Sequence, residues 1–182
     1  MSIYGPLRIV TEGAGGVQNP IPSGTPLTPK QYVYITLHLA PPPRAGGDPI
    51  VTATGSPTLP GDDPLTIRIY ADSVVAFTLD TSNADWEFSH AGGVSLATQG
   101  ASGIRYHNLF PAPGSTPSGV RSYTASFEAT YFQQSSANKD GYNLNFMIWR
   151  GADGTVYENG RVYSIDPDIK NPGNYGLILA ST

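Results

Sequence analysis

Cysteine is absent from this 182-residue sequence, so it can form no disulfide framework, thiolate metal site or thiol nucleophile. Charged residues are also scarce, at 13%, and the net charge of -4 gives no electrostatic footprint for nucleic acid or an anionic membrane surface. We expect neither as a partner. No apolar run is long enough to span a membrane, and the N-terminus lacks the features of a signal peptide, which favours a cytoplasmic protein.

A helical hydrophobic period is also missing, whereas glycine and proline are abundant, with 21 and 17 residues. This composition favours many short strands joined by turns. We expect an all-β fold, an antiparallel β-sandwich of immunoglobulin-like or jelly-roll type with long Pro/Gly-rich loops. Residues 1–29 read as an extended N-terminal arm, and residues 30–182 as a single β-sandwich domain with a long loop at 40–64.

Alternating apolar side chains predict the positions of the strands. The clearest alternation lies at 120–132, where one face is aromatic or alanine and the other, including Ser126 and Glu128, is predicted to be wet. We expect this strand and 142–150 to pair as a long hairpin at the centre of the sheet. Gly160 is expected in a hairpin turn at 158–160. The other predicted strands are 3–11, 31–39, 50–54, 65–70, 74–79, 86–88, 94–97, 104–110, 155–157, 161–165 and 176–180.

Residues with catalytic or metal-binding chemistry are few. The three histidines, His38, His90 and His107, lie outside any G-x-S-x-G elbow, which favours strand histidines with satisfied hydrogen bonds over a hydrolase base or a metal site. Aspartates at 62, 63, 72, 80, 85, 166 and 168 fall in expected turns, where carboxylates bind calcium or cap the turn. We expect no cofactor and no catalytic residue, with a calcium site as the alternative.

Aromatic side chains form the candidate ligand or interface set. These residues are Tyr32, Tyr34, Trp86, Trp149 and Tyr157. Flat aromatic rings can stack on sugars, but they also fill buried faces of sheets and protein interfaces. We favour the second interpretation and keep glycan binding as an alternative.

The segment 163–173, YSIDPDIKNPG, follows the strong strand at 142–149. With that strand it resembles the C-terminal pattern of small bacterial all-β proteins of the inclusion-body (PixA/AidA-like) type, and it is similar to the DP-EP proteins. The resemblance implies a cytosolic β-sandwich without a catalytic site, stored in some relatives as ordered protein bodies. The Pro-rich arm and the loop at 40–64 depart from that pattern, and the resemblance assigns no functional residue.

These observations lead to a functional hypothesis. We expect a non-enzymatic structural or interaction protein that associates with copies of itself, by exchange of the arm or of a strand. The alternative is a lectin-like carbohydrate-binding module that uses the loops near Tyr32, Trp86 and Trp149. An enzyme ranks third, because the sequence offers no assembled catalytic constellation. A phage or viral structural domain fits the first hypothesis equally well.

Overall fold

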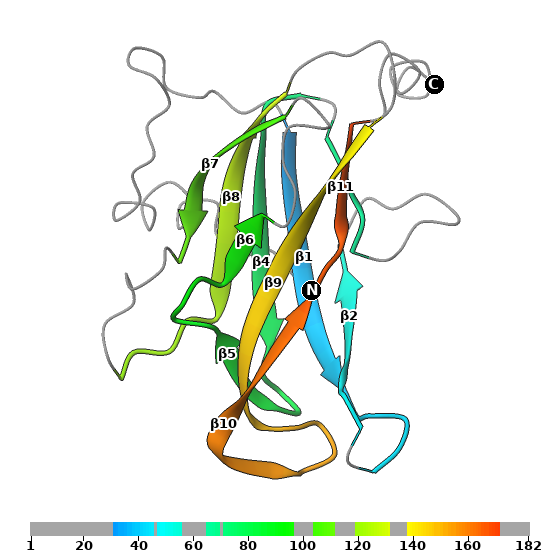
Figure 1. Ribbon diagram of the computed structural model, residues 1–182, viewed down its shortest axis with the longest axis vertical. Helices are drawn as coiled ribbons and strands as arrows, with labels where there is room; N and C mark the ends of the chain where they lie inside the picture. Colours follow the sequence, from blue (N-terminus) through cyan, green and yellow to red (C-terminus); the bar gives the residue numbers. More distant parts are fainter. Residues whose placement is uncertain are drawn as a thin grey trace.

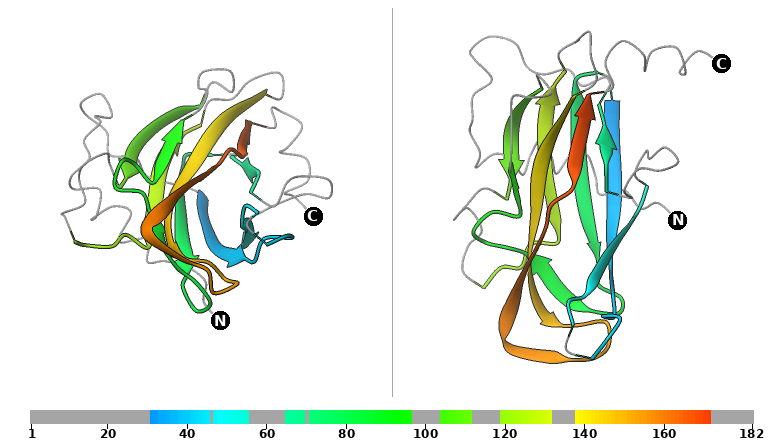
Figure 2. Two further views of the ribbon diagram at one scale, coloured as in Figure 1. Left: turned by 60° about the horizontal axis from the view of Figure 1, so that its bottom comes forward. Right: turned by 45° about the vertical axis from the view of Figure 1, so that its right-hand side comes forward.

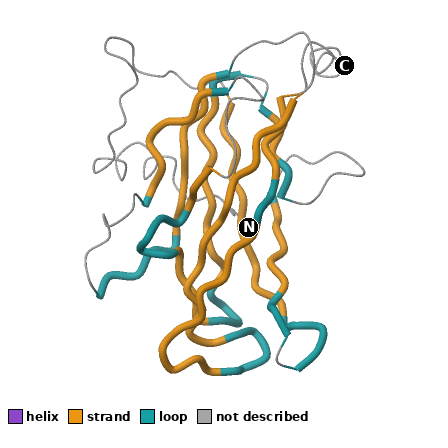
Figure 3. Tube along the Cα trace, in the orientation of Figure 1, coloured by secondary structure: helices purple, strands orange, loops and turns teal. Residues whose placement is uncertain are grey.

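Two β-sheets make up the fold in the computed structural model, which describes residues 31–45, 47–55, 65–69, 71–96, 104–111, 119–131 and 138–171. Every regular element within these segments is a strand (Figure 3). The sheets face one another, as Figure 1 and Figure 2 show from three directions. The all-β sandwich predicted from the sequence is therefore confirmed. In this part of the chain no helix is long and apolar enough to cross a membrane.

The first sheet has five strands in the spatial order β2-β1-β4-β8-β7. Its strands are β1 (Gln31–Ala40), β2 (Ile50–Thr54), β4 (Ser73–Asp80), β7 (Arg105–Phe110) and β8 (Thr124–Thr130). The second sheet has six strands, with β10-β9-β11-β3 in order and β5 and β6 also paired to β9. Its strands are β3 (Ile67–Arg68), β5 (Asp85–Phe88), β6 (Val94–Leu96), β9 (Asn138–Arg150), β10 (Val156–Ile165) and β11 (Asp168–Asn171).

Strand direction departs from the purely antiparallel expectation. Most pairs are antiparallel, but β1 and β4 run parallel, and so do β11 and β3. Parallel neighbours cannot be joined by a tight turn, so the chain between them must leave the pair and return. Between β1 and β4 it does so through β2 of the first sheet and β3 of the second.

Aromatic rings from both sheets fill the space between them. Phe77 of β4 lies 6.0 Å from Tyr142 of β9, measured between ring centroids, and Phe146 lies 5.1 Å from Trp86. All four side chains are fully buried. The Tyr142 hydroxyl donates to the Leu65 carbonyl over 2.7 Å, so the one polar atom of that ring is satisfied inside the core.

The outer face of the first sheet is not uniformly wet. Val74 and Ala76 are buried there and Tyr34 packs against them, so the second face of this sheet is partly covered. Ser126 and Glu128 of β8 are also buried, at 2% and 7% exposure. The wet face predicted for 120–132 is therefore wrong. The alternating pattern identified the inner face correctly, because the apolar residues mark that face. The pattern does not show whether the polar residues on the opposite face are buried as well.

The predicted hairpin between 120–132 and 142–150 is also wrong. β8 pairs with β4 and β7 in the first sheet, whereas β9 lies in the second sheet and pairs with β5, β6, β10 and β11. The expected turn at 158–160 is a bulge inside the single strand β10, with Gly160 at φ 70°. The arm at 1–29 and the strands predicted at 3–11 and 176–180 lie outside the described residues.

Candidate active site

A hydroxyl, an imidazole and a carboxylate form a hydrogen-bonded relay on the outer face of the first sheet. His38 Nε2 lies 3.0 Å from Thr54 Oγ1, and His38 Nδ1 lies 2.9 Å from Asp80 Oδ2. About a third of each of the His38 and Asp80 side chains is exposed, so solvent reaches the relay. This is the connectivity that activates a hydroxyl for proton transfer, recognised by geometry and roles rather than by sequence order.

Strand register brings the three residues together. His38 of β1 lies opposite Asp80 of β4 in the parallel pair, and opposite Thr52 of β2 in the antiparallel pair. Thr54, two residues from Thr52, projects from the same face because side chains on a strand alternate. Neighbouring strands lie about 5 Å apart, a spacing that side-chain hydrogen bonds across three strands can bridge.

Asp80 is held as an anion. The Ser82 amide donates to Oδ1 over 2.9 Å, and hydrogen bonds from Ser82, followed by those from His38, lower the pKa of the Asp80 carboxyl below its ordinary value against the opposing effect of burial. An ionised carboxylate only accepts hydrogen bonds, so His38 Nδ1 carries the proton. Nε2 then presents its lone pair to the Thr54 hydroxyl, as a general base requires.

Two of the sequence-predicted residues share a strand face with this relay. Tyr32 and Tyr34 project from the outer face of β1, on which His38 also lies. Tyr32 is 45% exposed, whereas Tyr34 is half-buried and packs against Val74 and Ala76. Burial, with a smaller contribution from Tyr32, raises the pKa of the Tyr34 phenol. Ligand binding by either tyrosine stays a prediction.

Trp86 belongs to the core rather than to a ligand surface. Its side chain is fully buried, so it has no exposed face on which a sugar could stack. Its indole Nε1 donates to the backbone carbonyl of Asp80 over 2.8 Å. This bond anchors the end of β4 that carries the relay carboxylate, so Trp86 supports the site from within the sandwich.

Trp149 lies in a separate polar cluster on the outer face of the second sheet. The buried Glu87 carboxylate accepts from Trp149 Nε1 over 2.9 Å, and its other oxygen lies 3.1 Å from His90 Nε2. The Arg121 guanidinium lies 5.5 Å from the centroid of the Trp149 ring and pairs with Asp85. The polar atoms of this cluster therefore satisfy one another, as a structural network does.

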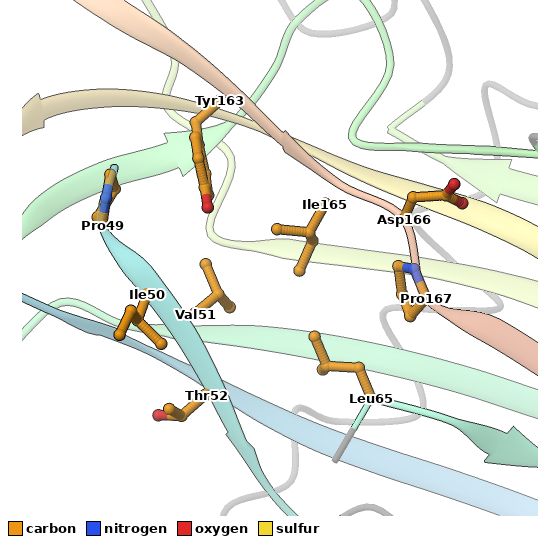
Figure 4. A pocket seen from close by; sticks show the side chains of 9 residues that line it. All are labelled: Pro49, Ile50, Val51, Thr52, Leu65, Tyr163, Ile165, Asp166 and Pro167. Carbon is orange, nitrogen blue, oxygen red and sulfur yellow. The ribbon is translucent and has the colours of Figure 1, made fainter. Parts of the chain in front are cut away.

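An open groove of about 430 Å³ lies between the edge strands β2 and β10. In Figure 4 the Tyr163 side chain extends from β10 toward β2, and the Asp166 carboxylate is directed away from the hollow. Burial, and to a lesser degree the nearby Asp48, raises the pKa of the Tyr163 phenol. The groove is otherwise mostly aliphatic. Its lining residues are Pro49, Ile50, Val51, Thr52, Leu65, Tyr163, Ile165, Asp166 and Pro167.

Tyr157, the last predicted aromatic residue, lies on β10 and is half-buried against the core. The Arg161 guanidinium stacks 5.8 Å from its ring centroid and pairs with Asp48. That ion pair joins β10 to the connection between β1 and β2, so it ties the two sheets together at the groove.

Aspartates that suggested a calcium site are occupied with other groups. Asp72 accepts from the Tyr131 amide, Asp85 pairs with Arg121, and Asp168 pairs with Lys139. Asp62 and Asp63 lie outside the described residues. Among the residues that are described, no three His, Asp or Glu side chains gather as a metal-binding group. Calcium binding stays untested.

Comparison with known proteins decides the family. A family model described as a predicted novel nucleotide synthetase matches residues 18–174. The chain belongs to that family. The match begins inside the predicted N-terminal arm, so residues 18–29 are part of the family's shared region. None of the curated proteins matches the sequence.

The chain also resembles one solved structure, but only distantly. The crystal structure of the PixA inclusion body protein from Burkholderia cenocepacia matches with a TM-score of 0.32 and 8% sequence identity, covering 82% of this chain and 99% of that chain. The resemblance noted in the sequence is thus supported only as a weak structural likeness. No functional conclusion rests on it.

The expectation of a non-enzymatic protein is wrong, because the family description names a predicted synthetase, which is an enzyme. The sequence did not reveal the relay, because Thr54, His38 and Asp80 lie on three strands without a local motif. In the sequence, His38 is a candidate base without a visible partner, and Asp80 is a candidate calcium ligand or turn cap. A parallel alignment of the two alternating strands predicted at 31–39 and 74–79 could have revealed the contact, because it places His38 opposite Asp80.

Proposed function

We propose that the protein is an enzyme that acts on nucleotides, with His38 as the general base. The observation that carries this proposal is the relay, in which Asp80 fixes the His38 ring and Nε2 faces a hydroxyl at 3.0 Å. Membership of a family described as a predicted nucleotide synthetase supplies the substrate class. Joining nucleotide units requires a hydroxyl to lose its proton as it attacks phosphorus, and a positioned imidazole accelerates that step by roughly 100- to 10,000-fold.

The groove supports recognition of the substrate. β2 carries both elements, with Val51 lining the groove and Thr54 in the relay. Thr52 also lines the groove, and the strand advances only about 7 Å from Thr52 to Thr54. β2 is an edge strand of its sheet, so one mononucleotide can pass around it with its base in the groove and its phosphates near His38. An aliphatic wall and a protonated phenol suit an uncharged nucleobase.

The test is turnover of nucleoside triphosphates, supplied singly and in pairs as their magnesium complexes and followed by separation of the products. We expect wild type to form a new nucleotide product and His38→Gln to lose about 100-fold or more in rate. His90→Gln is the matched control, because His90 is similarly exposed, at 39% against 35%, and also contacts a carboxylate. Equal activity in the two variants would refute the role of His38.

Self-association also stays a proposal, and it is favoured by the β10 edge of the second sheet, where no further strand pairs among the described residues. Val156 and Val162 of β10 are 66% and 69% exposed, and β10 is the terminal strand of the sheet path. Exposed apolar side chains on an edge strand favour pairing with the same edge of a second copy.

A further inference from the structure

The hydroxyl at one end of the relay belongs to a residue of the protein, Thr54. Thr54 is exposed at the last position of β2, and Gly55 follows with φ 88°, where the chain leaves the sheet. Within the described residues, the Thr54 hydroxyl has His38 as its only hydrogen-bond partner. Thr54 thus occupies the place that the hydroxyl of a substrate would need in order to give its proton to Nε2.

We propose that Thr54 is a nucleophile that carries a nucleotidyl group covalently during the reaction. This inference rests on the proposed function and adds a two-step course to it. His38 Nε2 takes the proton of the Thr54 hydroxyl, and Oγ1 attacks the α-phosphorus of a nucleoside triphosphate. The bond from that phosphorus to the bridging oxygen breaks, pyrophosphate leaves with the electron pair, and Thr54 holds a nucleoside monophosphate as a phosphodiester.

The second step returns the enzyme to its starting state. After the His38 proton has passed to solvent, Nε2 accepts the proton of an acceptor hydroxyl on a second nucleotide. The acceptor oxygen attacks the phosphorus, the bond to Thr54 Oγ1 breaks, and Thr54 recovers a proton from His38. The ionised Asp80 stabilises the imidazolium formed in each step, since it faces Nδ1 at 2.9 Å.

Neighbouring hydroxyls favour a phosphorus centre at this position. Thr36 lies opposite Thr54 in the register of β1 and β2, and Thr52 lies opposite His38. Thr36 also lies opposite Thr78, which in turn faces Thr124, so one row of threonines crosses four strands beside the relay. Thr36 is itself buried at 8% exposure, whereas Thr52 is exposed. A hydroxyl both donates and accepts, so the Thr52 hydroxyl can bind a phosphate oxygen without adding charge.

The decisive experiment measures covalent labelling and turnover together. The full chain is incubated with each nucleoside triphosphate, radiolabelled in the α-phosphate or in the γ-phosphate, and then denatured and washed. We expect the α-label alone to remain on wild type and on Thr54→Ser, with peptide mapping to residue 54. Thr54→Ala should carry no label and lose about 100-fold or more in turnover. Thr155→Ala is the control and should remain labelled, because Thr155 is also an exposed threonine with a hydroxyl bonded to a neighbouring side chain, and it belongs neither to the relay nor to the groove.

The outcomes separate this inference from the proposed function. Full turnover by Thr54→Ala, with His38→Gln inactive, would overturn the nucleophile and leave His38 as a base toward a substrate hydroxyl. Retention of the γ-label would also overturn it, because that result means phosphoryl rather than nucleotidyl transfer. Absence of nucleotide turnover in wild type would overturn both proposals.

Discussion

Phe146 is a core side chain whose removal should strongly destabilise the sandwich. Its ring is fully buried, with centroids 5.1 Å from Trp86 and 5.5 Å from Phe88. Phe146→Ala removes the ring and leaves a cavity that its neighbours fill only in part, which costs about 3–5 kcal/mol. Loss of two aromatic contacts, each worth about 0.5–1.5 kcal/mol, favours the upper half of that range. A domain of this size has a stability of about 5–15 kcal/mol, so the variant should fold but be much weakened.

Urea unfolding followed by tryptophan fluorescence measures this effect, because Trp86 itself lies against the deleted ring. With a denaturant slope of about 2 kcal/mol per molar, a loss of about 4 kcal/mol moves the midpoint by about 2 M. Val162→Ala is the control, because Val162 is 69% exposed on the strand next to β9 and should cost less than about 0.5 kcal/mol. A loss below about 1 kcal/mol for Phe146→Ala would refute the packing described here.

Three further predictions follow from contacts described above. Asp80→Asn should lower the free energy of unfolding at neutral pH, and the difference in this free energy from wild type should disappear as pH falls through the depressed pKa of Asp80. Urea unfolding at about pH 3 that shows the same difference as at neutral pH would contradict this. Gly160→Ala should lose more unfolding free energy than Gly154→Ala, since both have positive φ but only the first places a Cβ against the Met147 side chain; equal losses would exclude the clash. Val162→Lys should reduce the mass measured by light scattering at high concentration, and a monomeric wild type would remove the edge-pairing proposal.

Alternation along the chain was sufficient to identify the inner faces of the strands. Ile35 and Leu37 of β1 and Phe146 and Ile148 of β9 are all completely buried, as their spacing of two residues predicts. Alternation says that a strand has one buried face, but it does not name the partner strand. For that reason the assignment of β8 and β9 to one hairpin failed, although both strands and their inner faces were predicted correctly.

The relay illustrates the same limit at the level of a site. The sequence contains His38 in a strong strand and Asp80 at the end of another, and each residue is unremarkable by itself. Their contact depends on a parallel register between segments 42 residues apart, which no local pattern encodes. The aromatic residues drew attention because of their chemistry, yet Trp86 proved to be core and Trp149 to be held by Glu87.

The parallel pairing of β1 with β4 also bears on how the chain folds. Thr54 and His38 meet in the antiparallel pair β1–β2, whose strands adjoin in sequence, whereas Asp80 arrives only after the chain has crossed to the other sheet and returned. Contacts between segments distant along the chain generally form late, because the loop must close before the contact stabilises it. A chain halted at the β1–β2 stage would hold the hydroxyl and the imidazole without the carboxylate. If the relay acts as proposed, nucleotide turnover should therefore return during refolding only with the final, slowest phase, and not with the first formation of β-structure.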